Sequence, residues 1–177
     1  MPLDKTAIHK ANILFKHYGT SNPETIANEL GIHIHYTDCN GIKGMYAYIL
    51  RNRFIVIDNR LSNIERKIVL AHELGHDQLH RGSCFGAFSD NRYISYQNNR
   101  REIEANIFSS QLLISDDDFF ELFENAYTYD QIAKELRVFP ELLAIKVDIL
   151  REKGIKINPY ETGSKDFLKN KLENFRK

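Results

Sequence analysis

Cysteine is scarce in this chain, and its scarcity excludes a small protein held together by disulfides. Cys39 and Cys84 are the only two cysteines among 177 residues. They form neither a disulfide framework nor a Cys-x-x-Cys metal motif. We therefore expect both to be free thiols in a reducing compartment.

The sequence also lacks long apolar runs and an excess of charge of either sign. No apolar stretch approaches membrane-spanning length, and the start, Met1-Pro2-Leu3-Asp4-Lys5, leads into no apolar core of a signal peptide. Lys plus Arg equal Asp plus Glu at 24 each, so no global field draws the chain to nucleic acid or to an anionic membrane. We expect a cytoplasmic protein without a membrane partner or a direct nucleic-acid partner.

What the chain does contain is a helical entry, a small group of strands and a further series of helices. Alternating and β-branched runs predict strands, and apolar residues at helical spacing between capping residues predict helices. The predicted helices cover residues 4–18, 22–31, 100–114, 128–136 and 140–152. One further helix begins at Ser62, and another is capped by Ser115. The predicted strands cover residues 32–36, 45–50 and 54–58. The last two strands are expected to form a hairpin across Arg51-Asn52-Arg53, and residues 82–99 a long loop bordering the active site. The fold class is α+β.

The helix that opens at Ser62 carries a metal-binding pattern, His72-Glu73-Leu74-Gly75-His76. Histidines four residues apart lie about 40° apart around a helix and roughly 6 Å apart along it, so both imidazoles can reach one ion. Glu73 points about 100° away from His72, where a carboxylate can act as general base on a water. Ser62 and Glu65 form a capping box that makes this helix credible. The spacing favours a zinc peptidase over a chance occurrence of a short pattern.

A catalytic zinc needs a third protein ligand and one open position. His80 lies roughly 12 Å further along the same helix than His72, so it cannot bind the same ion. We predict that it contacts a ligand residue or the end of the helix instead. Glu102 and Glu104 point to nearly opposite faces of the next helix, and only one of them can be the ligand. We favour Glu102, because Asn106 follows one turn later and its amide can accept from a ligating histidine.

Taken together, the motifs resemble the ImmA/IrrE family of metallo-endopeptidases over about Asn22 to Ile149. The resemblance rests on Ala71-His72-Glu73-Leu74-Gly75-His76 with His80, on Glu102-Ile103-Glu104-Ala105-Asn106-Ile107-Phe108 and on Leu112-Leu113-Ile114. Ile114-Ser115 stands where the family often has Met-Pro, and Ser109-Ser110 replaces common alanines, which changes packing and not ligands.

The resemblance implies Zn²⁺ bound by His72, His76 and Glu102, with Glu73 as catalytic base. It also implies a zincin-like core, in which a three-stranded antiparallel or mixed sheet packs on the motif helix. We expect this core over residues 1–125, a helix-turn-helix-like region over 126–157 and a charged, partly ordered tail over 158–177. The short chain, without an appended sensor domain, resembles the ImmA branch of phages and integrative elements. The implied substrate is a helix-turn-helix repressor, cleaved to relieve repression.

Several points stay open at the level of sequence. Tyr93, Tyr96 or His80 could stabilise the oxyanion, and the strand over residues 45–50 could receive the substrate as an added strand or lie inside the sheet. One alternative function is a DNA-binding regulator acting through residues 128–152, and another is a zinc protein that binds a repressor without cutting it. The oligomeric state is not encoded in any pattern that we find.

Overall fold

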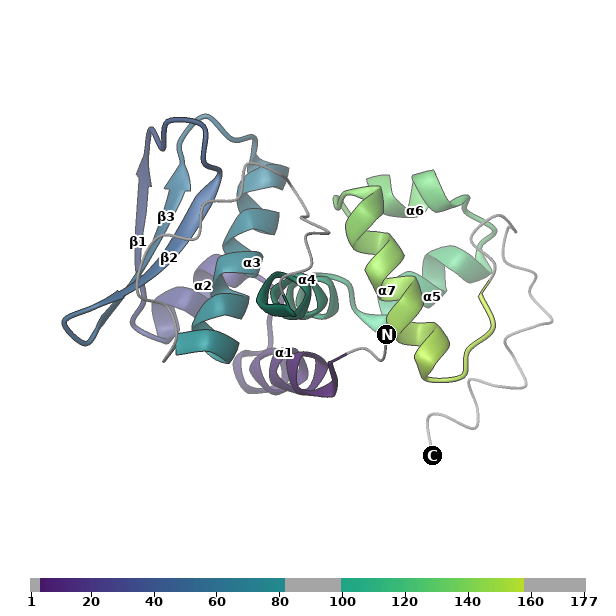
Figure 1. Ribbon diagram of the computed structural model, residues 1–177. Helices are drawn as coiled ribbons and strands as arrows, with labels where there is room; N and C mark the ends of the chain where they lie inside the picture. The colour runs from purple at the N-terminus through teal and green to yellow at the C-terminus, as the bar shows by residue number, and fades with distance from the viewer. Residues whose placement is uncertain (1–3, 82–99, 158–177) are drawn as a thin grey trace. The chain divides into compact units, whose positions relative to one another are not determined.

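A computed structural model of the chain describes residues 4–81 and 100–157 (Figure 1). The chain divides into two compact units, Met1–Leu113 and Ile114–Lys177. Within the described residues, no helix combines the length and the apolar character needed to cross a membrane. The first unit consists of α1 (Lys5–Tyr18), α2 (Pro23–Glu29), β1 (His33–Thr37), β2 (Gly44–Ile49), β3 (Asn52–Asp58), α3 (Asn63–His80) and α4 (Arg100–Leu113).

The sheet of the first unit has three strands in the order β1-β3-β2. β1 runs parallel to the central β3, and β2 runs antiparallel to it, so the sheet is mixed. Ile55 and Ile57 of β3 and Tyr46 of β2 are fully buried, in agreement with a sheet that has one covered face. The predicted mixed α+β architecture is therefore present.

The hairpin between β2 and β3 is tighter than we predicted. Ile49 pairs with Asn52, which leaves Leu50 and Arg51 as a two-residue turn, and both have positive φ, at 49° and 66°. Two positive φ values match the right-handed twist of the flanking strands, as in a type I′ turn. The prediction of a three-residue connection across Arg51-Asn52-Arg53 was wrong because Asn52 and Arg53 belong to β3.

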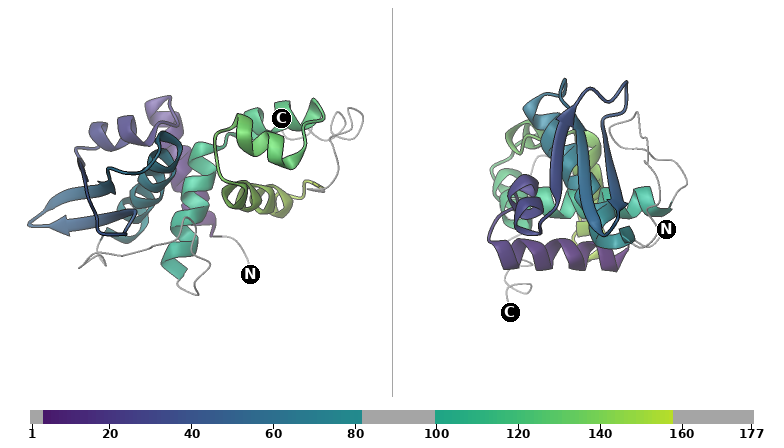
Figure 2. Two further views of the ribbon diagram at one scale, coloured as in Figure 1. Left: turned by 90° about the horizontal axis from the view of Figure 1, so that it is seen from above. Right: turned by 90° about the vertical axis from the view of Figure 1, so that its left-hand side faces the viewer.

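Helix α3 covers one face of the sheet and also contacts α4 (Figures 1 and 2). It begins at the predicted capping box: the Ser62 hydroxyl accepts from the Glu65 amide, and the Glu65 carboxylate accepts from the Ser62 amide. Its buried side includes Ile68, Leu70 and Leu74. The motif helix therefore lies between the sheet and α4.

The second unit contains α5 (Asp116–Glu124), α6 (Tyr129–Glu135) and α7 (Pro140–Glu152). Asp116, at the start of α5, forms ion pairs with Lys146 of α7 and with Lys153 at its end. α5 also contacts α6. These contacts place residues 114–125 with the two following helices, whereas the predicted division assigned them to the core. The predicted tail, 158–177, and the predicted loop, 82–99, lie outside the described residues.

Candidate metal centre

Three side chains from α3 and α4 bring their ligand atoms together at one point. Nε2 of His72 lies 3.1 Å from Nε2 of His76 and 3.2 Å from Oε2 of Glu102. Nε2 of His76 lies 3.5 Å from Oε1 of Glu102. One ligand atom of each residue lies within 4.8 Å of those of the other two.

These separations fit a tetrahedral zinc ion. Zinc binds imidazole nitrogen and carboxylate oxygen at about 2.0–2.2 Å, and tetrahedral angles then place the ligand atoms about 3.3–3.6 Å apart. The observed separations of 3.1 to 3.5 Å lie close to that range. Two imidazoles and one carboxylate are also a ligand set that leaves a fourth position for water or substrate. The three residues can therefore hold a metal ion of this kind.

Gly75 explains how α4 comes close enough to supply the third ligand. A Cβ atom at Gly75 would lie 3.1 Å from Cα of Ala105 and 3.1 Å from Cδ1 of Phe108, tighter than ordinary van der Waals contact. Ala105 lies about one helical turn after Glu102. The absence of a side chain at Gly75 therefore lets α4 approach until the Glu102 carboxylate reaches the two histidines.

Of the two glutamates that the sequence offered, the structure brings Glu102 to the histidines. Glu104 points elsewhere: its Oε2 accepts from His80 Nε2 at 2.8 Å, and its Oε1 accepts from Arg100 Nε at 2.6 Å. From the sequence, Glu104 was considered only as the alternative ligand, so its contact with His80 was not predicted. The four-residue spacings of His76 with His80 and of Arg100 with Glu104 were the available signals.

The nitrogen atoms of the two histidines that face away from Glu102 also have partners. Nδ1 of His72 lies 2.8 Å from Oδ1 of Asn106, where we expected an orienting amide. Nδ1 of His76 lies 3.1 Å from Nδ1 of His80. Both ring nitrogens of His80 are thereby engaged, so His80 is not aimed at a substrate carbonyl as an oxyanion donor. Tyr93 and Tyr96, the other candidates, lie outside the described residues.

The electrostatics of the cluster suit a cation. Burial lowers the pKa of His76 to about 4, and the nearby His72 and His80 act in the same direction, against the carboxylate of Glu102. Burial alone would lower the pKa of His72, but Glu102 and Glu73 outweigh it and raise the value. Burial opposes ionisation of Glu102, yet its hydrogen bonds with the two histidines bring its pKa well below the ordinary range. At neutral pH the site therefore offers an ionised carboxylate and a neutral His76.

Glu73 lies beside this cluster, as expected of a general base. Only 5% of its surface is exposed, and its negative charge raises the pKa of the neighbouring His72. A buried carboxylate next to a metal site is suited to accept a proton from a water and to pass it on. Burial and the charge interaction with His72 keep Glu73 as the candidate for the general base.

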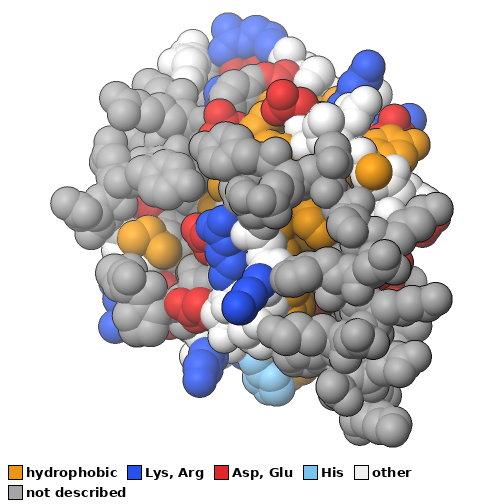
Figure 3. Space-filling model, turned by 90° about the vertical axis from the view of Figure 1, so that its right-hand side faces the viewer, with side chains coloured by type: hydrophobic (Ala, Val, Ile, Leu, Met, Phe, Trp, Pro, Cys, Tyr) orange, Lys and Arg blue, Asp and Glu red, His pale blue; other side chains and the backbone are white. Residues whose placement is uncertain are grey.

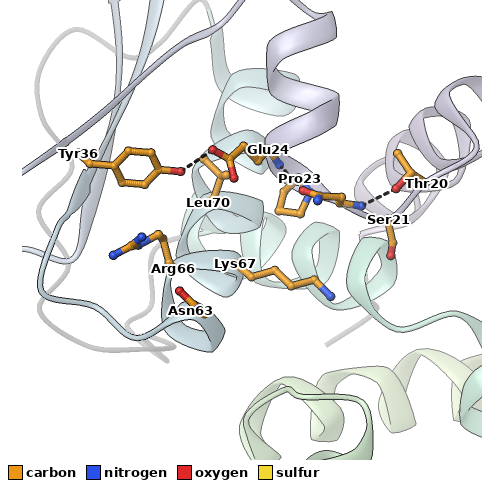
Figure 4. Close-up of a pocket in the computed structure, with 10 residues that line it drawn as sticks. Thr20, Ser21, Pro23, Glu24, Tyr36, Asn63, Arg66, Lys67 and Leu70 are labelled. Carbon is orange, nitrogen blue, oxygen red and sulfur yellow. Dashed lines mark hydrogen bonds between the residues drawn. The ribbon is translucent and has the colours of Figure 1, made fainter.

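A pocket of about 460 Å³ lies elsewhere in the first unit (Figure 4). The Tyr36 hydroxyl donates to Glu24 at 2.9 Å, and the Arg66 guanidinium lies 5.1 Å from the centre of the Tyr36 ring. Burial and the Glu24 carboxylate raise the pKa of Tyr36 to about 12. None of the three ligand residues lines this pocket. It is therefore distinct from the candidate metal centre.

Comparison with known proteins adds a family and a relative. Residues 27–148 match the family described as IrrE N-terminal-like domain, Peptidase_M78. The chain is also 35% identical over 145 residues to a protein of Bacillus phage phi105 named "Uncharacterized immunity region protein 2", a match that covers 81% of this chain and 89% of the phage protein. The family match includes the whole motif of α3 and the glutamate of α4.

Proposed function

Because the chain belongs to the IrrE N-terminal-like, Peptidase_M78 family, as its motifs predicted, we propose that it is a zinc-dependent endopeptidase that cleaves a helix-turn-helix repressor of a phage or mobile element. The observation that carries the peptidase assignment is the cluster of His72, His76 and Glu102, whose ligand atoms have separations close to those of a tetrahedral zinc site. The substrate class is supported by the similar phage protein, whose name places it in an immunity region.

Each residue of the site has a definite task in this proposal. A bound zinc supplies a Lewis acid that polarises the scissile carbonyl and acidifies a water. Glu73 accepts a proton from the attacking water and then donates it to the leaving amine nitrogen, so that one C–O bond forms, the C–N bond breaks and one water is consumed. Glu102 stays ionised throughout because its pKa is low. Asn106 holds the ring of His72 in place.

The sheet suggests how a peptide could bind. β2 lies at one edge of the sheet: it pairs with β3, and no second strand pairs with it among the described residues. An edge strand offers backbone N–H and C=O groups to an extended peptide. We propose that the substrate adds beside β2 in an extended conformation.

The basic residues of α7 do not support the DNA-binding alternative. The side chain of Lys146, a basic residue of α7, is fully buried in the ion pair with Asp116 and does not face a phosphate. Arg151 donates to the carbonyl of Ile157 at 2.9 Å. On the face drawn in Figure 3, Lys and Arg side chains of the described residues lie beside Asp and Glu side chains. This mixture does not favour a phosphate backbone.

The proposal is tested by incubating the zinc-loaded protein with the helix-turn-helix repressor of its own genetic element and measuring fragment masses. We expect one cut by the wild type, no cut by Glu73→Gln although zinc stays bound, and loss of both zinc and cleavage in Glu102→Ala. Glu29→Gln, which changes an exposed glutamate of α2, serves as the matched control and should cut normally. If Glu73→Gln relieves repression as well as the wild type does, the protein acts by binding and not by hydrolysis.

A further inference from the structure

Behind the metal ligands, two buried histidines of α3 and a half-buried glutamate of α4 are hydrogen-bonded in a row. His76 contacts His80 through their Nδ1 atoms at 3.1 Å, and Nε2 of His80 contacts the Glu104 carboxylate at 2.8 Å. His76 is 1% exposed and His80 is 7% exposed, so water does not readily replace these partners. The three side chains form one hydrogen-bonded chain, Glu104–His80–His76.

The direction of the hydrogen bonds in this chain follows from which groups can donate. An ionised carboxylate only accepts, so Nε2 of His80 must carry the proton that it shares with Glu104. A neutral imidazole has one N–H, which leaves Nδ1 of His80 as an acceptor. The proton in the contact between the two Nδ1 atoms must therefore come from His76. His76 is then left with a lone pair on Nε2, the atom that faces His72 and Glu102.

We propose that Glu104 and His80 are positioning residues that fix His76 in its metal-binding tautomer. The proposal rests on the metal site assigned above and adds a requirement to it: the third histidine of α3 and the second glutamate of α4 act as one unit. If His80 instead carried protons on both nitrogens, His76 would have to accept at Nδ1. Its own proton would then lie on Nε2, where it blocks the metal.

The two ligand histidines are consequently oriented in different ways. His72 has a neutral amide, Asn106, at its outer nitrogen. His76 is linked at its outer nitrogen to the carboxylate of Glu104 through the imidazole of His80. Arg100 holds the other oxygen of Glu104, but its side chain is 81% exposed, so we expect this pair to contribute little. The negative charge of Glu104 should make His76 the more strongly electron-donating of the two ligands.

The decisive measurement is ¹⁵N NMR of histidine side chains in the zinc-loaded, full-length protein. We expect His76 to carry its proton on Nδ1 and His80 to carry one proton, on Nε2. Zinc affinity, measured by competition with a chromophoric chelator, supplies a second readout. Glu104→Ala should weaken zinc binding about 10- to 100-fold, the usual cost of losing an outer partner of a ligand. Glu104→Gln should weaken it less, because the amide oxygen still accepts from His80.

Control variants distinguish an effect on the Glu104–His80–His76 hydrogen bonds from a general loss of structure. Arg100→Ala removes the exposed ion pairs of Arg100 with Glu104 and Asp4 and should leave zinc affinity nearly unchanged. The double variant with His80→Ala and Glu104→Ala should bind zinc only slightly more weakly than either single variant, because both changes break the same row of hydrogen bonds. Glu104→Ala combined with Asn106→Ala should show the two losses added, because they act on different ligands.

Three results would overturn the inference. One is a proton on Nδ1 of His80 in the zinc-loaded wild type, which can be seen even if every variant fails to fold. Another is a Glu104→Ala variant that binds zinc as tightly as the wild type with unchanged His76 shifts. If the wild type bound no zinc at all, the assignment of the metal site would itself be refuted, and the role of Glu104 and His80 with it.

Discussion

Gly75 lies at the closest approach of α3 and α4, and replacing it with alanine tests whether this approach builds the metal centre. The added Cβ would lie 3.1 Å from Cα of Ala105 and 3.3 Å from its carbonyl oxygen, so the nearest neighbours include backbone atoms that cannot rotate away. Phe108, also at 3.1 Å, is fully buried and has little room to move. The helices must therefore separate by a few tenths of an ångström.

The expected magnitude combines two opposing effects. Alanine improves helix propensity over glycine by about 1 kcal/mol. Overpacking a close contact costs about 1–3 kcal/mol. The net loss in the free energy of unfolding is about 1 kcal/mol, which lowers the melting temperature by about 3 °C for a chain of this size. Zinc distances tolerate only about 0.2 Å of error, so moving Glu102 with α4 should raise the zinc Kd by about tenfold.

The assay is thermal unfolding of the metal-free chain together with a zinc competition titration of each variant. Lys67 provides the control, since it lies in the same helix and is only half-buried. The difference between Lys67→Ala and Lys67→Gly measures the helix propensity alone, and alanine should be the more stable by about 1 kcal/mol. A Gly75→Ala variant that gains this same amount and keeps its zinc affinity would refute the close-approach argument.

Three further predictions concern the hairpin, the second unit and the acid response of the metal centre. Leu50→Asn should raise the free energy of unfolding by about 0.5–1 kcal/mol in urea titrations, because Leu50 is 90% exposed and its φ of 49° suits asparagine better; an unchanged midpoint would contradict strain at this turn. Lys146→Ala should lower the free energy of unfolding by about 3 kcal/mol, because it leaves the partly buried Asp116 with one partner fewer and opens a cavity. Lys153→Ala, at the exposed end of the helix, should lower it by less than about 1 kcal/mol in the same titration. Zinc affinity should fall as the pH drops through the raised pKa of His72, because the protonated ring cannot bind the metal, while His76, with a pKa of about 4, stays neutral. Calorimetry in several buffers near pH 6, about half a unit below the ordinary histidine pKa, should therefore detect close to one proton released per zinc bound. Release of two protons would contradict this assignment.

The sequence specified those features that depend on residues close together along the chain. Caps and periodicity located α1, α3 and the helices of the second unit, because capping and i, i+4 contacts are local. The same local geometry placed His72 and His76 on one face of α3 and Glu73 beside them. Even the preference for Glu102 followed from the spacing to Asn106 within a single helix.

The tertiary structure decided every feature that depends on contacts between distant segments. That Glu104 reaches His80, that Lys146 is buried against Asp116 and that residues 114–125 pack with α6 and α7 are all contacts between helices. No local pattern specifies them, because the rotation of one helix against another is set by packing over its whole length. Sequence alone therefore gave the candidate ligands of this protein, and the packing of α4 on α3 at Gly75 decided which of them meet.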